Sequence, residues 1–130
     1  MRRAYRPALP LLAALALSAC SEASREHPFE TVKSPGGAWS LSASVIDPWF
    51  PQGPHFVVIA VRDEQSGVSK RLAKTDLAYD GVPFTKQNIG IRWIGDTQAL
   101  VCLRATDRPD KGVRILIKDG KPGAELKPGC

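Results

Sequence analysis

Hydrophobic and polar side chains alternate along much of this chain. Between residues 39 and 45, Trp, Leu, Ala and Val alternate with three serines, a pattern typical of a strand with one buried face. Residues 55–62 are almost entirely apolar, which is typical of a central strand covered on both faces. Further strands are predicted over residues 68–72, 89–94, 99–104 and 113–118. Outside the N-terminal segment we expect no helix, with at most one helical turn over residues 74–78.

Turn sequences separate these strands at regular intervals. They are Ser34-Pro35-Gly36-Gly37, Asp63-Glu64-Gln65-Ser66-Gly67, Asp80-Gly81 with Val82-Pro83, Gly95-Asp96-Thr97-Gln98 and Asp119-Gly120. Glycine, proline, aspartate and asparagine favour such turns because of their backbone conformations or short polar side chains. About six short strands in this arrangement predict an all-β fold, a small antiparallel meander curled into a sandwich or an open barrel.

The N-terminal segment has the composition of an export signal. Its first six residues include Arg2, Arg3 and Arg6 and no acid, and an apolar run follows from Ala8 to Ala19. As a helix, roughly 12 residues would span about 18 Å, well short of the ~30 Å hydrocarbon core of a membrane. The segment therefore predicts a signal peptide over residues 1–19 rather than a spanning helix.

Leu17-Ser18-Ala19-Cys20 closes this segment and resembles the lipobox of bacterial lipoproteins. The resemblance implies that Cys20 receives a diacylglyceryl group, that signal peptidase II cleaves before it, and that it becomes the acylated N-terminus. Two or three acyl chains would make a durable anchor, whereas one chain gives only marginal binding. An ordinary signal peptide, or a buried N-terminal helix with a chance cysteine, is the alternative.

The residue after the cysteine and the leader composition suggest a compartment. Ser21, rather than Asp, follows Cys20, and in lipoproteins of Gram-negative bacteria this implies release to the outer membrane with the domain facing the periplasm. The leader is rich in Ala, Arg and Pro, which favours a Gram-negative source. The expected organisation is a signal peptide (1–19), a polar tether (20–31) and a β-domain (32–130).

Length and charge exclude several classes of protein. With 130 residues the chain is too short for a propeller, a TIM barrel or a dinucleotide-binding enzyme. Three of its 18 basic residues lie in the leader, so 15 remain against 13 acidic residues, a net charge of about +2. That charge is small and scattered, so we expect no nucleic-acid partner.

The three cysteines can be divided by role. If Cys20 carries lipid, Cys102 and Cys130 remain as an even pair. A disulfide between them would tie the Gly- and Pro-rich tail, residues 118–130, to a core strand and would add about 3.5 kcal/mol in the chain-entropy model. The alternatives are a buried structural thiol at Cys102 and a free or intermolecular thiol at Cys130.

Two short elements resemble part of a known repeat. Ser34-Pro35-Gly36-Gly37-Ala38-Trp39 is similar to the Ser-Pro-Asp-Gly-Lys-Trp opening of a propeller-type β-repeat, with Gly36 where Asp is usual. Ile91-Arg92-Trp93-Ile94-Gly95-Asp96, running into Ala99-Leu100-Val101, resembles its hydrophobic–Trp–turn–strand element. Both occur in this order in small bacterial lipoprotein domains of unknown function, and the likeness covers roughly residues 30–117. It implies no activity, and an unrelated small β-domain is the alternative.

The sequence offers no set of residues typical of an active site, and we expect no enzyme and no cofactor. Most aspartates stand where turns already favour them, and no carboxylate pair has the spacing of a catalytic dyad. The two histidines are His27, in the expected tether, and His55, at the start of a strand. Neither has a partner at metal-ligand spacing, so no metal is predicted. Cys102 has no basic neighbour to activate its thiol.

One loop has the composition of an interaction surface. Residues 47–54 hold three prolines and place Trp49 beside Phe50. A rigid loop that presents large apolar side chains loses little entropy on binding. The commoner alternative is a lid, in which the two rings fold over an open end of the sandwich.

Two functions remain in competition. The first is a non-catalytic, membrane-anchored lipoprotein that binds an envelope protein or glycan, through Trp49 and Phe50 or through a sheet face bearing Arg92 and Arg104. The second is a periplasmic inhibitor or immunity-type protein that blocks a toxin or a wall hydrolase. A hydrolase that uses His55 as its base is the least favoured reading.

Overall fold

The structure is a computed structural model that describes residues 22–50, 53–77 and 85–130. The expected signal peptide, Cys20 and the turn expected at residues 80–83 lie outside these described residues. Within them, no helix is long and apolar enough to cross a membrane.

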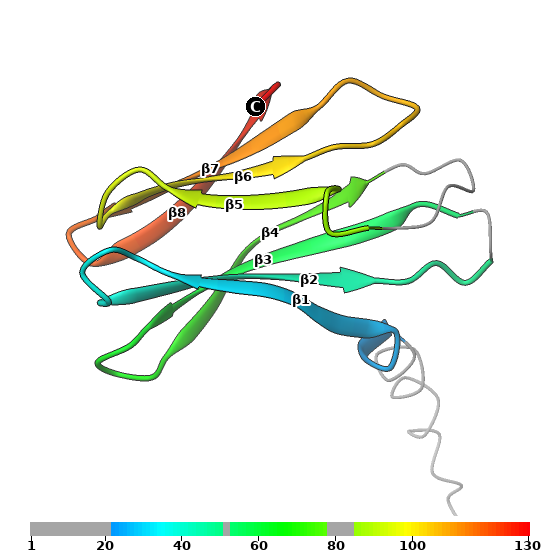
Figure 1. Ribbon diagram of the computed structural model, residues 1–130. Helices are drawn as coiled ribbons and strands as arrows, with labels where there is room; N and C mark the ends of the chain where they lie inside the picture. The colour runs from blue at the N-terminus through cyan, green and yellow to red at the C-terminus, as the bar shows by residue number, and fades with distance from the viewer. Residues whose placement is uncertain (1–21, 51–52, 78–84) are drawn as a thin grey trace, which may run out of the picture.

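Eight strands form two antiparallel sheets of four, which lie one above the other (Figure 1). The strands are β1 (Glu26–Lys33), β2 (Trp39–Ile46), β3 (His55–Asp63), β4 (Ser69–Leu77), β5 (Ile89–Trp93), β6 (Gln98–Leu103), β7 (Lys111–Lys118) and β8 (Lys121–Pro128). Neighbours in each sheet follow chain order, β1 to β4 and β5 to β8. The predicted all-β meander is therefore confirmed, as a two-layer sandwich.

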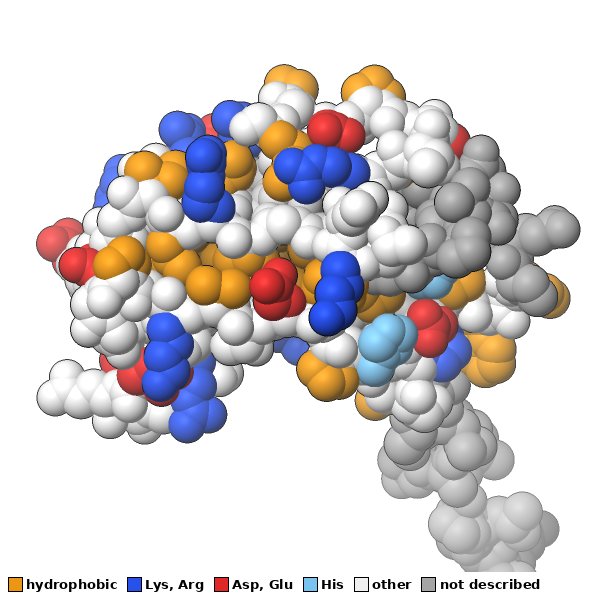
Figure 2. Space-filling model, viewed as in Figure 1, with side chains coloured by type: hydrophobic (Ala, Val, Ile, Leu, Met, Phe, Trp, Pro, Cys, Tyr) orange, Lys and Arg blue, Asp and Glu red, His pale blue; other side chains and the backbone are white. Residues whose placement is uncertain are grey.

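The core lies between the sheets and consists of the alternate residues that point inward. From the first sheet it includes Leu41, Ala43, Val45, Val57, Ile59 and Val61, and from the second Ala99, Val101, Leu103, Val113 and Ile115. All of these are at most 1% exposed. Figure 2 shows hydrophobic side chains as a band between the two layers. Burial of these inner faces is the main favourable term in folding, and it holds the layers together.

The first sheet contains a strand that the sequence pattern did not indicate. A polar tether was expected over residues 20–31, but β1 begins within this stretch, at Glu26. β1 pairs with β2 along its whole length, with an irregularity between Pro28 and Glu30. It is an edge strand, and its exposed residues do not alternate cleanly, so its sequence lacks the period of a half-buried strand.

The second sheet also gains a strand, from the tail expected after Lys118. Asp119 and Gly120 both have positive φ angles, 51° and 70°, the backbone of a type I′ hairpin turn. The chain then returns as β8, where Pro122 and Pro128 are tolerated because an edge strand leaves one side of its backbone unpaired. The single helical turn that the sequence allowed over residues 74–78 is absent from the described part of that segment, since β4 continues to Leu77.

Polar contacts join the two sheets at their margins. The Trp93 indole Nε1 donates a hydrogen bond of 3.0 Å to the Val32 carbonyl oxygen. At the same end, the Gly36 amide donates to Asp96 Oδ1 at 2.5 Å. A Cβ at Gly36 would lie 2.8 Å from that oxygen, so the glycine leaves room for the Asp96 carboxylate.

At the other end, Lys111 of β7 joins the second sheet to β4. Its Nζ donates to Thr75 Oγ1 at 2.8 Å and to Asp76 Oδ1 at 3.1 Å. Asp76 also forms an ion pair with Arg108 at 2.7 Å. The hydrogen bond from Lys111 is the main cause of the lowered pKa of Asp76, because it favours the ionised carboxylate.

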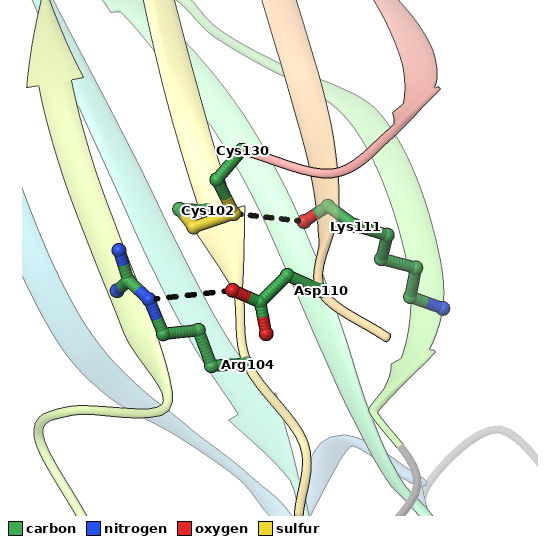
Figure 3. Close-up of a disulfide and its surroundings, with 5 residues drawn as sticks. All are labelled: Cys102, Arg104, Asp110, Lys111 and Cys130. Atoms are coloured by element: carbon green, nitrogen blue, oxygen red, sulfur yellow. Dashed lines mark hydrogen bonds and ion pairs between the residues drawn. A yellow bond between two sulfur atoms is a disulfide. The ribbon is translucent and has the colours of Figure 1, made fainter. Parts of the chain in front are cut away.

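The end of the chain is held on the outer face of the second sheet by a disulfide. Cys102 and Cys130, the pair considered in the sequence analysis, are joined, with Cα atoms 5.4 Å apart (Figure 3). Gly112 lies opposite Cys102 in the register of β6 and β7, and a Cβ on it would lie 2.7 Å from the Gly129 carbonyl oxygen. The tail can therefore reach Cys102 only because residue 112 has no side chain.

We predict that Gly112→Ala destabilises the fold and lowers the fraction of chains with the bridge. Backbone cannot yield to the new methyl group as a flexible side chain would, and overpacking of this kind costs about 1–3 kcal/mol. Urea unfolding and titration of free thiols would measure both effects. Gly123→Ala is the matched control, because its Cβ would meet only the Leu116 carbonyl oxygen, at 3.9 Å. Equal stability of the two variants would contradict this account of the tail.

Candidate functional site

Three places in the structure carry side chains that could bind a ligand or a partner. They are two surfaces and a group of two histidines around Asp47. The first surface, here called the aromatic groove, is bordered by Trp49, Phe50 and Phe56 together with Arg25 and Lys74, and encloses about 390 Å³. It lies where the β2–β3 connection meets the residues before β1. Both segments are at the right-hand end of the molecule in Figure 1.

Trp49 and Phe50 are 67% and 76% exposed. The lid alternative is therefore wrong, because a lid would bury both rings on the core. The Trp49 ring is nevertheless held in place: the Arg25 guanidinium lies 4.6 Å from the ring centroid, a cation–π contact. Arg25 Nη1 also donates to the Asp47 carbonyl oxygen at 2.5 Å, and the Asp47 amide donates to the Arg25 carbonyl oxygen at 3.1 Å.

Two of the three charged side chains that border the groove form an ion pair. Lys74 Nζ forms an ion pair with Glu22 and lies 5.2 Å from the centroid of the Phe56 ring. The hydrogen bond from Lys74 is the main cause of the lowered pKa of Glu22. Arg71, on the same strand as Lys74, pairs with Glu26 at 2.7 Å. The groove thus combines two exposed aromatic rings with one ion pair and one further cation, Arg25.

The second surface, here called the basic face, is the outer side of the β5–β8 sheet. Figure 2 shows several Lys and Arg side chains over this layer. Among the ion pairs between described residues, Arg104 pairs with Asp110 at 3.8 Å and Arg114 with Glu125 at 2.7 Å, and none involves Arg92. Arg92 is exposed on β5, opposite Leu100 of β6.

A hollow of about 340 Å³ lies on this face, between Arg92 and Arg104. Its floor includes Gly90, Leu100 and the Cys102–Cys130 bridge. The Arg104 Nη1 atom would lie 3.3 Å from a Cβ at Gly90, so the missing side chain leaves space for the guanidinium. Figure 3 shows Arg104 and Asp110 side by side next to the bridge, joined by their ion pair. An apolar floor with a cationic rim suits an acidic group carried on an apolar stem.

The position of Arg104 is fixed by its backbone. Asn88, which is 9% exposed, donates from Nδ2 to the Arg104 carbonyl oxygen at 2.7 Å, and the Arg104 amide donates to the Asn88 carbonyl oxygen at 2.8 Å. The Asn88 side-chain oxygen accepts a hydrogen bond from the Thr85 amide at 2.8 Å. The residue just before β5 therefore orders the residue just after β6, and the Arg104 side chain projects from an ordered backbone.

The structure brings together two histidines that lie far apart in the sequence, His27 and His55. His27 Nδ1 and His55 Nε2 lie 3.4 Å and 3.5 Å from different oxygens of Asp47. The three residues come from neighbouring strands, and Asp47 follows directly after Ile46, the last residue of β2. The His55 side chain is 14% exposed, and burial is the main cause of its lowered pKa, against an opposing effect of Asp47.

Ligand-type atoms gather at one other place in the described part of the chain. Cys102, Asp110 and Cys130 each offer an atom within 4.8 Å of the others. The two sulfurs, however, are joined in the disulfide, and metal ligation by cysteine requires the thiolate. This cluster is therefore better explained as a structural bridge beside an ion pair.

Comparison with known proteins gives no relative for this chain. No protein-family model matches it, and neither a curated protein nor a solved structure shows significant similarity.

The buried histidine predicts a pH dependence of stability. His55 has a lowered pKa when folded, so the unfolded chain binds its proton more readily. The free energy of unfolding should therefore fall as the pH drops below about 6.5, the ordinary histidine value, and through the lower folded pKa. At higher pH both states are neutral and the contribution is absent. Carboxylates with a lowered pKa, such as Glu26 and Asp76, also change the free energy of unfolding with pH, but in a more acidic range.

Urea unfolding between pH 4.5 and 8 would measure this effect. His55→Gln should remove most of the decline between about pH 6.5 and 5, because glutamine does not titrate. His27→Gln is the control, since its side chain is 49% exposed and should keep most of it. If His55→Gln left the pH dependence of the free energy of unfolding unchanged, the buried imidazole of His55 would not be the cause of the decline.

Proposed function

We propose that this protein is a lipid-anchored, non-catalytic module of the bacterial envelope, held on the outer membrane with its domain facing the periplasm. In this view Cys20 carries the anchor and the domain binds an envelope partner. The proposal rests on the chemistry of its own residues.

The observation that carries the proposal is the use of the cysteines. Of the three in the chain, Cys102 and Cys130 form a disulfide, and bridges of this kind persist in oxidising compartments such as the periplasm. Cys20 is the third, and it follows an apolar leader that resembles a lipoprotein signal. Export and acylation together give each cysteine a role, and no free thiol is left in an oxidising compartment.

The basic face supports the choice of a binding module. Arg92 and Arg104 rim a hollow whose floor is apolar, and ordered charges around an apolar floor favour specific recognition of an oppositely charged group. The partner that fits this chemistry is an envelope protein or wall polymer that presents a carboxylate. A wall-degrading enzyme as that partner would make the protein an inhibitor, which is one outcome of the second test below.

We predict that the chain is labelled by palmitate in a Gram-negative host and fractionates with membranes. Cys20→Ser should abolish both the label and cleavage of the leader, because a hydroxyl cannot replace the thiol in thioether formation. Cys130→Ser is the matched control: it should lose the disulfide and keep the label. Mass spectrometry of the processed N-terminus that found the Cys20 sulfur without lipid would overturn the proposal.

A photo-crosslinking residue placed at Arg92 should give a discrete adduct in living cells. The same residue at Lys70, an exposed position on β4 of the other sheet, should give none. Arg104→Glu should reduce the adduct about tenfold, since it reverses a charge at the rim of the hollow. If the Arg104→Glu variant gave as much cross-linked adduct as the protein with Arg104, the basic face would not make the contact.

A further inference from the structure

We propose that the aromatic groove contacts the lipid surface, with Trp49 and Phe50 lying in the headgroup layer of the membrane that carries the anchor. This inference rests on the proposed acylation of Cys20. The occupant of the groove is then the bilayer itself, and the domain stands on the membrane in one orientation.

The first argument is the length of chain between the anchor and the domain. Cys20 precedes Glu22 by two residues, and two residues span at most about 7 Å. Glu22 borders the aromatic groove, and its carbonyl oxygen accepts a hydrogen bond from the Arg25 amide at 3.0 Å. The tether expected from the sequence would have lifted the domain away, but residues 22–33 belong to the domain. An acylated Cys20 would therefore hold the groove within reach of the headgroups, a layer about 5–7 Å thick.

The second argument is the chemistry of the groove. Trp49 and Phe50 are the only adjacent pair among the large hydrophobic residues exposed in the described chain; the others are Val68, Ile94 and Leu126. Tryptophan concentrates at membrane interfaces because its ring is apolar and its N–H is polar. Arg25 and Lys74 lie against aromatic rings at the groove, and the aliphatic stems of such side chains add apolar area at a membrane interface.

The third argument separates this contact from electrostatic adsorption. The charged residues that border the groove are Glu22, Arg25 and Lys74. Lys74 is paired with Glu22, and two cations against one anion give a formal charge of +1, far less than the cluster of basic residues that attracts anionic lipid. Apolar insertion beside an acyl anchor depends little on ionic strength, whereas a polybasic contact weakens with salt. The proposal therefore predicts a contact that persists at high salt.

Quenching of tryptophan fluorescence by brominated lipid tests the contact. The acylated protein would be purified from membranes and reconstituted into vesicles of phosphatidylcholine with bromine on its acyl chains. Trp39 begins β2, and Ile46 at the other end borders the groove, so about 24 Å of strand separates them. Trp93 lies at the end of the sandwich far from the groove, because its indole donates to Val32, which pairs with Leu41 near the start of β2. Only Trp49 should therefore be quenched.

Emission should fall by roughly one third relative to unbrominated vesicles, because one of three tryptophans lies at the bilayer. Raising the salt should leave this loss of emission unchanged.

Trp49→Phe should abolish the loss of emission while keeping an aromatic ring under Arg25. Phe50→Ser should reduce it, since Trp49 would sit less deeply. Val68→Ser is the matched control, because Val68 is also exposed (65%) but follows β3 at the opposite end of the sandwich.

The possible failures can be told apart. If the protein floats with the vesicles and carries lipid, yet Trp49 is not quenched, the groove faces elsewhere; this inference is then wrong and the lipoprotein proposal stands. A protein partner on the groove would produce this result. If the protein carries no lipid and does not float, both the proposed function and this inference are wrong.

Discussion

Each sheet of this protein has one apolar face, and neither face can be buried without the other sheet. The inner residues of β2 and β3 are covered by those of β6 and β7, and these four strands supply most of the side chains that are fully buried. The outer strands contribute less to the core. They are held by backbone pairing and by specific polar contacts, such as the Trp93 hydrogen bond to Val32 and the Lys111 contacts with β4. The centre of the sandwich thus depends on hydrophobic burial, whereas its margins depend on particular residues.

This division explains which strands the sequence could predict. The six expected strands include every strand that is central in its sheet, because burial of one or both faces imposes an alternating or continuous apolar pattern. β1 and β8 are edge strands without a buried residue, so no such pattern is imposed on them. The edge strands β4 and β5 each keep buried residues and were predicted. Pro122 and Pro128 argued against a strand, since a central strand excludes proline. The Asp119-Gly120 sequence did contain the signal for a hairpin, and β8 could have been inferred from it.

The candidate surfaces were predictable to different degrees. Composition alone singled out Trp49 and Phe50, but it could not distinguish a lid from an exposed pair, because that depends on where Arg25 lies. The contact of His27 and His55 with Asp47 depends on the registers of three strands, and β1 was not among the strands expected. The disulfide, by contrast, could be predicted without knowing the strand registers. Once Cys20 is assigned to lipid, only Cys102 and Cys130 remain, and these are the two cysteines that the structure joins.

The early start of β1 changes what an anchor at Cys20 would do. A flexible tether of 11 residues, on the order of 18 Å between its ends, would let a domain tumble above the membrane. Because residues 22–33 belong to the domain, the first sheet and the aromatic groove would instead be held at the surface. The basic face, on the outer side of the other sheet (Figure 1), would then point away from the lipid. Anionic headgroups would not compete for Arg92 and Arg104, and both would remain available to a partner in the periplasm. One molecule could in this way use an apolar surface toward the membrane and a charged one toward its partner without conflict between them.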